Sequence, residues 1–255
     1  MRQRSATLGV PGLMLAASLL SAPAPACLAH AYVVTPVSMT LNTDDPRGEF
    51  RLVNQDSNPV RVQVDVQLWS QDGRRNQQVA TDDFIVSPRF ADIPAQGSQI
   101  VRVAYRRRGG LPQELSYRVM FRELPSPDQT GTARGVALNY SVPLFVVPPV
   151  AGSPQLAWQA TQTGDSTLRV DIRNAGSVHS KIKFGSLVRQ QHPDLPAISE
   201  SELQRAVQTA LVHYVLAGSQ REMYLKLASP LTPGEHLLLT VDVDAKQQQI
   251  PLVVQ

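Results

Sequence analysis

The sequence predicts an all-β protein built from two antiparallel β-sandwich domains, with a short helix inserted in the second. Three observations lead to this prediction. Polar and apolar residues alternate with a period of two in many runs after residue 31, which is typical of half-buried strands. Asn, Asp, Gly and Pro separate these runs at short spacing. No helical pattern alternates regularly with the strands, so an antiparallel sandwich is favoured over a parallel sheet.

Four runs define the clearest strands expected in the first domain. In residues 60–68, valines and a leucine alternate with polar residues. The other three expected strands cover residues 49–53, 100–105 and 117–121. Turns are expected between the strands at Asn58-Pro59, Asp72-Gly73, Gln96-Gly97 and Gly109-Gly110. Short strands joined by such turns are typical of a sandwich.

A proline-rich break divides the chain. Residues 147–154 contain three prolines and a glycine, which cannot continue a strand ladder, so we expect a short stiff linker there. The expected boundaries are 32–147 for the first domain, 148–154 for the linker and 155–255 for the second domain. Strands are expected there at residues 168–172, around Ile182 and Phe184, and at 222–227 and 237–243, with a turn at Asn174-Ala175-Gly176.

The exception to the β pattern lies in the second domain. Residues 200–211 have helical composition, and Leu203, Val207 and either Ala210 or Leu211 recur at helical spacing. This segment predicts the inserted helix.

The first 31 residues have the three parts of an export signal. Arg2 and Arg4 precede an apolar stretch at residues 13–20, and Ala29-His30-Ala31 matches a cleavage pattern. The stretch is shorter than the roughly 20 residues that span a bilayer. We therefore interpret residues 1–31 as a cleaved signal peptide. Lipidation at Cys27 is the alternative; on the preferred cleavage the mature chain has no cysteine and no disulfide.

The mature chain is nearly neutral, which gives no support to a nucleic-acid partner. Removal of the signal lowers Lys plus Arg from 24 to 22, against 21 Asp plus Glu, so the net charge is +1. Nucleic-acid-binding domains usually carry a strong basic excess.

The patterns that support catalysis or metal binding are missing from the sequence. The histidines are scattered and do not occur at ligand spacing: His30, His179, His192, His213 and His236. Ser38, Ser87 and Ser98 lack a nucleophile-elbow context. The adjacent acids at 44–45 and 82–83 face opposite ways on an extended chain. We therefore expect no enzyme activity, no metal, no cofactor and no small-molecule substrate.

The most informative segment is the last run before the linker, residues 134–146. Val136, Leu138, Tyr140 and Val142 share one face, and the stretch from residue 135 to 147 carries no charge. An ordinary sandwich strand is one interpretation, because any half-buried strand alternates in this way. The alternative is an apolar edge strand that pairs with a partner, since proteins normally protect such edges with charge.

Taken together, several segments of the chain resemble the periplasmic chaperones of chaperone–usher pili, and specifically their archaic, spore-coat-like branch. The resemblance rests on the order and spacing of several segments, which together cover nearly all of the mature chain. These are residues 35–37, 50–54, 87–90, 94–103, 116–119, 121–125, 142–146, 174–179 and 214–219.

The resemblance implies a periplasmic protein with two immunoglobulin-like domains and no catalytic role. It implies that Val136, Leu138, Tyr140 and Val142 belong to a donor strand that completes an unfinished pilus or fimbrial subunit. It also implies that the subunit is then delivered to an outer-membrane usher.

The chain departs from the family at the anchor for the subunit's C-terminal carboxylate. Well-known members use an Arg and a Lys, and the matching positions here are Ser38 and Pro143. Neither side chain can pair with a carboxylate. Arg118 is the first candidate for a replacement because it lies on the expected neighbouring strand, and Arg102 is the second. A solvated or structural arginine is the alternative for both.

Two other classes of protein stay open at this point. A structural immunoglobulin-like pilus subunit or surface adhesion module would also be built from sandwich domains, although a pilin is expected to have a free N-terminal extension of alternating residues. A periplasmic hydrolase on a β scaffold would be expected to show a clustered triad or metal set.

Overall fold

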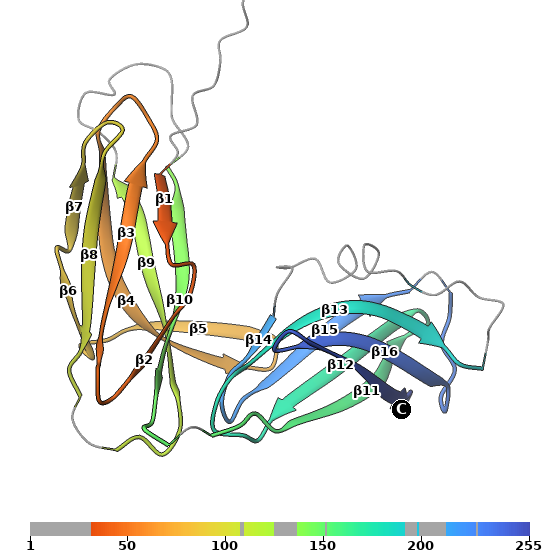
Figure 1. Cartoon of the computed structure of the whole chain (residues 1–255). Helices are drawn as coiled ribbons and strands as arrows, with labels where there is room; N and C mark the ends of the chain where they lie inside the picture. Colours follow the sequence, from red (N-terminus) through yellow and green to blue (C-terminus); the bar gives the residue numbers. More distant parts are fainter. Residues whose placement is uncertain are drawn as a thin grey trace, which may run out of the picture.

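The computed structural model describes residues 32–107, 110–124, 137–150, 152–191, 198, 213–227 and 229–255. These residues form two β-sandwiches that meet at one end in an L shape (Figure 1). All regular elements in these ranges are strands, which confirms the all-β prediction. The predicted signal peptide and the predicted helix at 200–211 lie outside the described residues. Within the described ranges, no helix is long and apolar enough to cross a membrane.

The first sandwich consists of two sheets. One has the strand order β1-β3-β8-β6, and the other has the order β2-β10-β9-β4-β5, with β7 also paired to β4. All four clear strands expected in this domain are confirmed, in β3, β4, β8 and β9. The strands are β1 Tyr32–Thr35, β2 Met39–Asn42, β3 Arg47–Asn54, β4 Val60–Asp72, β5 Arg75–Ala80, β6 Phe84–Ser87, β7 Phe90–Ile93, β8 Ser98–Tyr105, β9 Leu115–Leu124 and β10 Asn139–Val147.

The period-two alternation fills the space between these two sheets. Val60, Val62, Val64 and Val66 of β4 all face inward and are buried. Burial of each such side chain stabilises the fold by about 1.5–3 kcal/mol relative to exposure. The pattern changes at Trp69, which is buried on the opposite face of β4, outside this core.

The second sandwich has a three-stranded sheet in the order β11-β12-β15 and a four-stranded sheet in the order β14-β13-β16-β17. It encloses a separate hydrophobic core that includes Leu168, Ile182 and Leu239. The strands expected in this domain are confirmed, in β12, β13, β15 and β16. The strands are β11 Leu156–Gly164, β12 Thr167–Asn174, β13 Ser180–Arg189, β14 His213–Val215, β15 Gln220–Lys226, β16 His236–Val243 and β17 Lys246–Val253.

The predicted turn at Asn174-Ala175-Gly176 holds the linker against the second sandwich. The Asn174 side-chain oxygen accepts hydrogen bonds from the N–H groups of Gln155 (3.0 Å) and Gly176 (2.9 Å). A Cβ atom at residue 176 would lie 2.2 Å from the carbonyl oxygen of Ser153, so glycine is needed for this close approach.

The two sandwiches contact each other through the long β4–β5 hairpin, which reaches the second domain (Figure 1). The Gln71 side chain donates to the carbonyl of Tyr214 at 2.8 Å and accepts from the N–H of Leu216 at 3.0 Å. Beside it, Trp69, Phe145 and Leu216 form a small buried cluster between the domains. The junction is therefore both packed and hydrogen-bonded.

Candidate functional site

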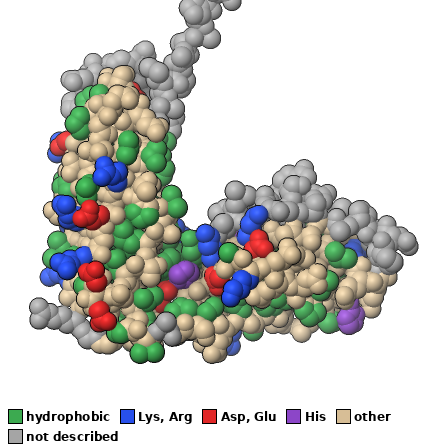
Figure 2. Space-filling view, viewed as in Figure 1, with side chains coloured by type: hydrophobic (Ala, Val, Ile, Leu, Met, Phe, Trp, Pro, Cys, Tyr) green, Lys and Arg blue, Asp and Glu red, His purple; other side chains and the backbone are tan. Residues whose placement is uncertain are grey.

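Strand β10 has an edge that is only half covered. On one side β9 pairs with β10 from Asn139 to Val146. On the other side β2 pairs only from Leu144 to Val147, in parallel. Among the described strands, none pairs with that side of β10 between Asn139 and Pro143. Hydrophobic side chains gather on the side of the first domain that lies inside the L (Figure 2).

One hydrogen bond fixes the direction of the backbone groups along this edge. The N–H of Glu123 donates to the carbonyl of Leu138 at 3.1 Å, so these residues form a hydrogen-bonded pair of the β9–β10 ladder. Because pair types alternate, Asn139, Ser141 and Pro143 direct their backbone groups away from β9. Proline is tolerated at 143 because β9 does not need its N–H. Since Leu144 directs its own groups to β9, its parallel pairing with Met39 uses the flanking Pro143 carbonyl. The open edge therefore presents two N–H groups and two carbonyls, those of Asn139 and Ser141.

The structure places the predicted donor residues on the inward face of β10. Val142 is buried in the core of its own domain, and Leu138 and Tyr140 are partly buried against that core. Tyr140 donates from its hydroxyl to the carbonyl of Tyr32 at 2.7 Å. Val136 lies outside the described residues. The described donor side chains thus point between the two sheets rather than into solvent.

Arg118 lies directly opposite Pro143 in the β9–β10 ladder, on the outward face that borders the second domain. The Arg118 guanidinium carbon is 3.8 Å from the centre of the Trp69 ring, and Nη1 donates to the carbonyl of Ser141 at 3.3 Å. Its Nε is buried without a hydrogen-bond partner. Burial lowers the pKa of Arg118, which nevertheless remains charged at neutral pH.

The charge of Arg118 is not matched by a carboxylate in the described part of the chain. Arg122, four residues further along β9 and on the same face, forms an ion pair with Asp65. For Arg118 no ion pair is found with a described residue. A guanidinium without a carboxylate partner is suited to bind an incoming carboxylate.

The structure does not bring Arg102 to this edge. Arg102 lies on β8, in the other sheet of the first sandwich, and its Nε is 3.2 Å from a carboxylate oxygen of Glu49. We therefore no longer regard Arg102 as an anchor candidate. Alternation along the chain places Arg102 opposite its apolar neighbours, but it does not show in which of the two sheets the strand lies. Ser38 is exposed in the bend between β1 and β2.

Sequence reasoning missed the aromatic residues around Arg118. Trp69 and Tyr214 come from different domains, and their rings meet edge to face with centroids 5.7 Å apart. The one available signal was the pair Leu68-Trp69, where two large apolar residues are adjacent in a strand that otherwise alternates. A second apolar face at the end of a strand indicates a further contact surface.

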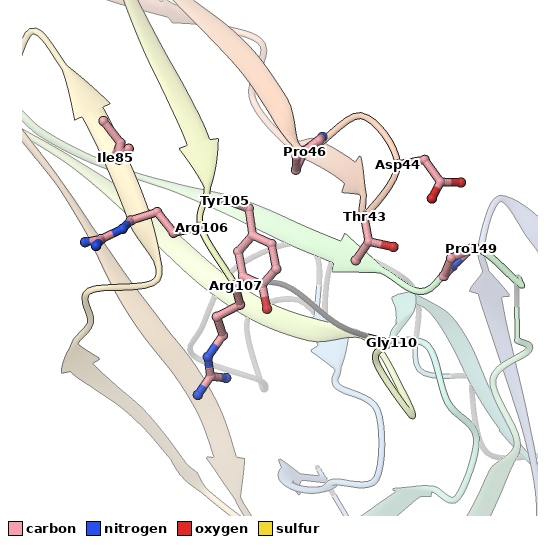
Figure 3. Close-up of a pocket in the computed structure, with 9 residues that line it drawn as sticks. All are labelled: Thr43, Asp44, Pro46, Ile85, Tyr105, Arg106, Arg107, Gly110 and Pro149. Atoms are coloured by element: carbon pink, nitrogen blue, oxygen red, sulfur yellow. The ribbon is translucent and has the colours of Figure 1, made fainter.

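A separate pocket of about 770 Å³ lies at the end of the first sandwich near the linker, between Ile85, Arg106 and Pro149 (Figure 3). Arg107 also lines it, and its Nε is 3.0 Å from an oxygen of Asp83. Its described lining residues include no pairing of a nucleophile with a base. Among the residues that the structure describes, no three His, Cys, Asp or Glu side chains gather as metal ligands do.

The fold and the open edge first define a class: a protein of two immunoglobulin-like β-sandwiches with an unpaired strand edge beside the domain junction. The family follows from sequence. Residues 31–151 match the family described as pili and flagellar-assembly chaperone, PapD N-terminal domain. The match covers the first domain and confirms the predicted resemblance to the pilus-assembly chaperones.

Solved structures of similar fold cover most of the chain. A chain of the CsuC–CsuE chaperone–tip adhesion subunit complex from archaic Csu pili of Acinetobacter baumannii is 20% identical, with a TM-score of 0.62, over 88% of this chain and 99% of that chain. The E. coli chaperone DraB is 18% identical, with a TM-score of 0.55, over 87% and 97%.

A chain of the Salmonella enterica SafA pilin–SafB chaperone complex is 15% identical, with a TM-score of 0.56, over 88% of this chain and 95% of that chain. At these identities the likenesses establish the two-domain fold. No curated protein matches the chain in sequence.

Proposed function

We propose that the chain is a periplasmic chaperone that lends strand β10 to pilus or fimbrial subunits and delivers them to an outer-membrane usher. The observation that carries the proposal is the open edge of β10 from Asn139 to Pro143, with Arg118 beside its end. The match of residues 31–151 to a pilus-assembly chaperone domain favours this function over that of a structural subunit or adhesion module. Two of the similar structures are themselves described as complexes of a chaperone with a subunit.

Strand addition uses the backbone of the edge for affinity and side chains for specificity. Each backbone hydrogen bond to a partner strand contributes about 0.5–1.5 kcal/mol net, so several are needed together. Leu138 and Tyr140 lie at the open end of the sandwich, partly buried. At this point a subunit that lacks a strand could pack its own apolar side chains against those of the first domain. We propose that Val136 continues the row formed by Leu138, Tyr140 and Val142.

The edge also limits where a partner strand can end. Beyond Pro143 the edge is occupied by β2, so pairing must stop there. A partner strand that runs parallel to β10 would reach this point with its C-terminal carboxylate. Arg118 lies opposite Pro143, and a guanidinium can bind a carboxylate through two parallel hydrogen bonds. We therefore propose Arg118 as the replacement anchor for the family's Arg and Lys.

The sequence patterns supply the remaining parts of the proposal. Residues 1–31 are proposed as the cleaved signal that exports the chain to the periplasm. The proposed domains are 32–147 and 155–255, joined by the linker at 148–154.

The test uses a substitution that changes only the open edge. Ser141→Pro removes an N–H that points away from β9, whereas Ser141→Ala keeps it, so the β9–β10 ladder stays intact in both. Tagged wild type and both variants are purified from the periplasm of the bacterium that encodes the chain. Partners are identified by mass spectrometry, and thermal unfolding checks that each variant is folded.

We expect wild type and Ser141→Ala to bring down a pilin-like subunit in a one-to-one complex, and Ser141→Pro to lose it. Equal recovery of that subunit by folded Ser141→Pro would overturn lending through this edge. Failure of the wild type to recover any subunit would count against the chaperone function itself.

A further inference from the structure

The Arg118 guanidinium lies beside aromatic rings from both domains. Its central carbon is 3.8 Å from the centre of the Trp69 ring and 5.9 Å from that of the Tyr214 ring. Aromatic faces attract cations, and this attraction is stronger where water is excluded. The second domain therefore contributes directly to the surroundings of the charge proposed to bind a carboxylate.

Hydrogen bonds hold the Trp69 ring and the backbone of Tyr214 in place. The indole N–H of Trp69 donates to the side-chain oxygen of Asn76 at 3.1 Å. The backbone carbonyl of Tyr214 accepts from the Gln71 side chain at 2.8 Å. Gln71 lies on β4, so the same strand that carries Trp69 also fixes the backbone of Tyr214.

Arg118 itself has little else to hold it. Its Nε has no partner, and the one hydrogen bond found from its guanidinium among the described residues is the contact with the carbonyl of Ser141 at 3.3 Å. The position of the guanidinium thus depends on the two rings. Without the Tyr214 ring, the charge would be free to swing away from the end of the open edge at Pro143.

We infer that Tyr214 is a positioning residue that holds the Arg118 guanidinium where a partner's C-terminal carboxylate arrives. The second domain thereby sets the preference of the first domain for a free carboxylate. This inference rests on the proposed function, since it assigns a cause to the affinity of the same anchor. By linkage, a carboxylate bound at Arg118 also strengthens the contact between the domains.

The experiment compares two synthetic probes: a nonapeptide of alternating Thr and Val with a free C-terminal carboxylate, and the same peptide with a C-terminal amide. The chain has two tryptophans, so a Trp158→Phe background leaves Trp69 as the fluorescent reporter beside Arg118. The measured quantity is the ratio of the two affinities. A merely structural role of Tyr214 would change both affinities alike and leave the ratio constant.

We expect the background protein to prefer the free acid and Arg118→Gln to abolish the preference. Tyr214→Leu should reduce the preference by about threefold to tenfold, while Tyr214→Phe, which keeps the ring, should preserve it. Tyr214→Met serves as a second non-aromatic variant, and thermal unfolding identifies any variant that loses its fold.

The outcomes separate this inference from the proposed function. If Arg118→Gln abolishes the preference but folded Tyr214→Leu and Tyr214→Met keep it in full, the role of Tyr214 is overturned and the anchor stands. If the background protein shows no preference, or Arg118→Gln retains it, the anchor is wrong and the inference fails with it.

Discussion

The ring of Phe145 lies flat against the imidazole of His179, with centroids 3.7 Å apart and 11° between the planes. Phe145 belongs to β10, whereas His179 belongs to the second domain. His179 Nδ1 is 2.8 Å from both carboxylate oxygens of Glu114, a residue of the first domain. The covered half of β10 is thus fixed by the second domain, while the half before Pro143 keeps an open edge.

Removal of the Phe145 ring should weaken the junction between the domains. Phe145 is 2% exposed, so Phe145→Ala leaves a cavity and is expected to lower the free energy of unfolding by about 3–5 kcal/mol. Urea unfolding followed by circular dichroism measures this. Val188→Ala, at a side chain 38% exposed, is the control and should change it by less than about 0.5 kcal/mol. Equal effects of the two substitutions would show that the Phe145–His179 contact adds no stability.

Acid should destabilise the second domain through His213. Burial, with a smaller effect of Arg221, lowers the pKa of His213 from 6.5 to about 4. Since the pKa is lower in the folded state than in the unfolded state, the unfolded chain takes up the proton first as the pH falls. The stabilising contribution is therefore complete above about pH 6.5 and is lost progressively between pH 6.5 and about 4.

The measurement is the thermal midpoint at several pH values across this range. His213→Leu should show a smaller drop on acidification than wild type, because the titrating group is gone. His236→Gln, at an exposed position, should follow wild type. If His213→Leu and wild type lose stability in parallel, His213 is not the group responsible.

The buried ion pair of Arg189 with Glu235 should show strong coupling. Arg189 also donates to the Ser229 hydroxyl at 2.6 Å and to the Pro230 carbonyl at 2.7 Å. Arg189→Met removes this cation from the buried Glu235 carboxylate, which is expected to cost about 3–5 kcal/mol. A double-mutant cycle with Glu235→Leu, measured by urea unfolding, should show the double variant to be more stable than Arg189→Met alone. Additive losses would contradict this.

The sequence predicted which residues of the donor segment share a face, but left open whether that face contacts the protein's own core or a partner. Leu138, Tyr140 and Val142 lie on one side of β10, as their spacing indicates. Alternation is a local property of an extended chain, so it cannot show whether a face meets the protein's own core or a partner. The structure shows that the described part of this face packs against the first domain.

The two anchor candidates illustrate the same limit. Arg118 and Arg102 both interrupt apolar runs in expected strands. Their difference comes from neighbours far away in the chain: Glu49 pairs with Arg102, whereas Trp69 and Tyr214 surround Arg118. Tyr214 is distant in sequence and belongs to the other domain, so no local pattern could place it there.

The sequence by itself predicted the clearest strands, several of the turns between them, the proline-rich break and the resemblance to a chaperone family. These features follow from residue periodicity and turn chemistry, which act over a few residues. Only the tertiary structure decided that β2 stops short of Ser141, that Pro143 marks the end of the open edge and that Arg118 lacks a described carboxylate partner. Edge coverage and charge pairing depend on which distant segments the fold brings together, and that is a property of the whole chain.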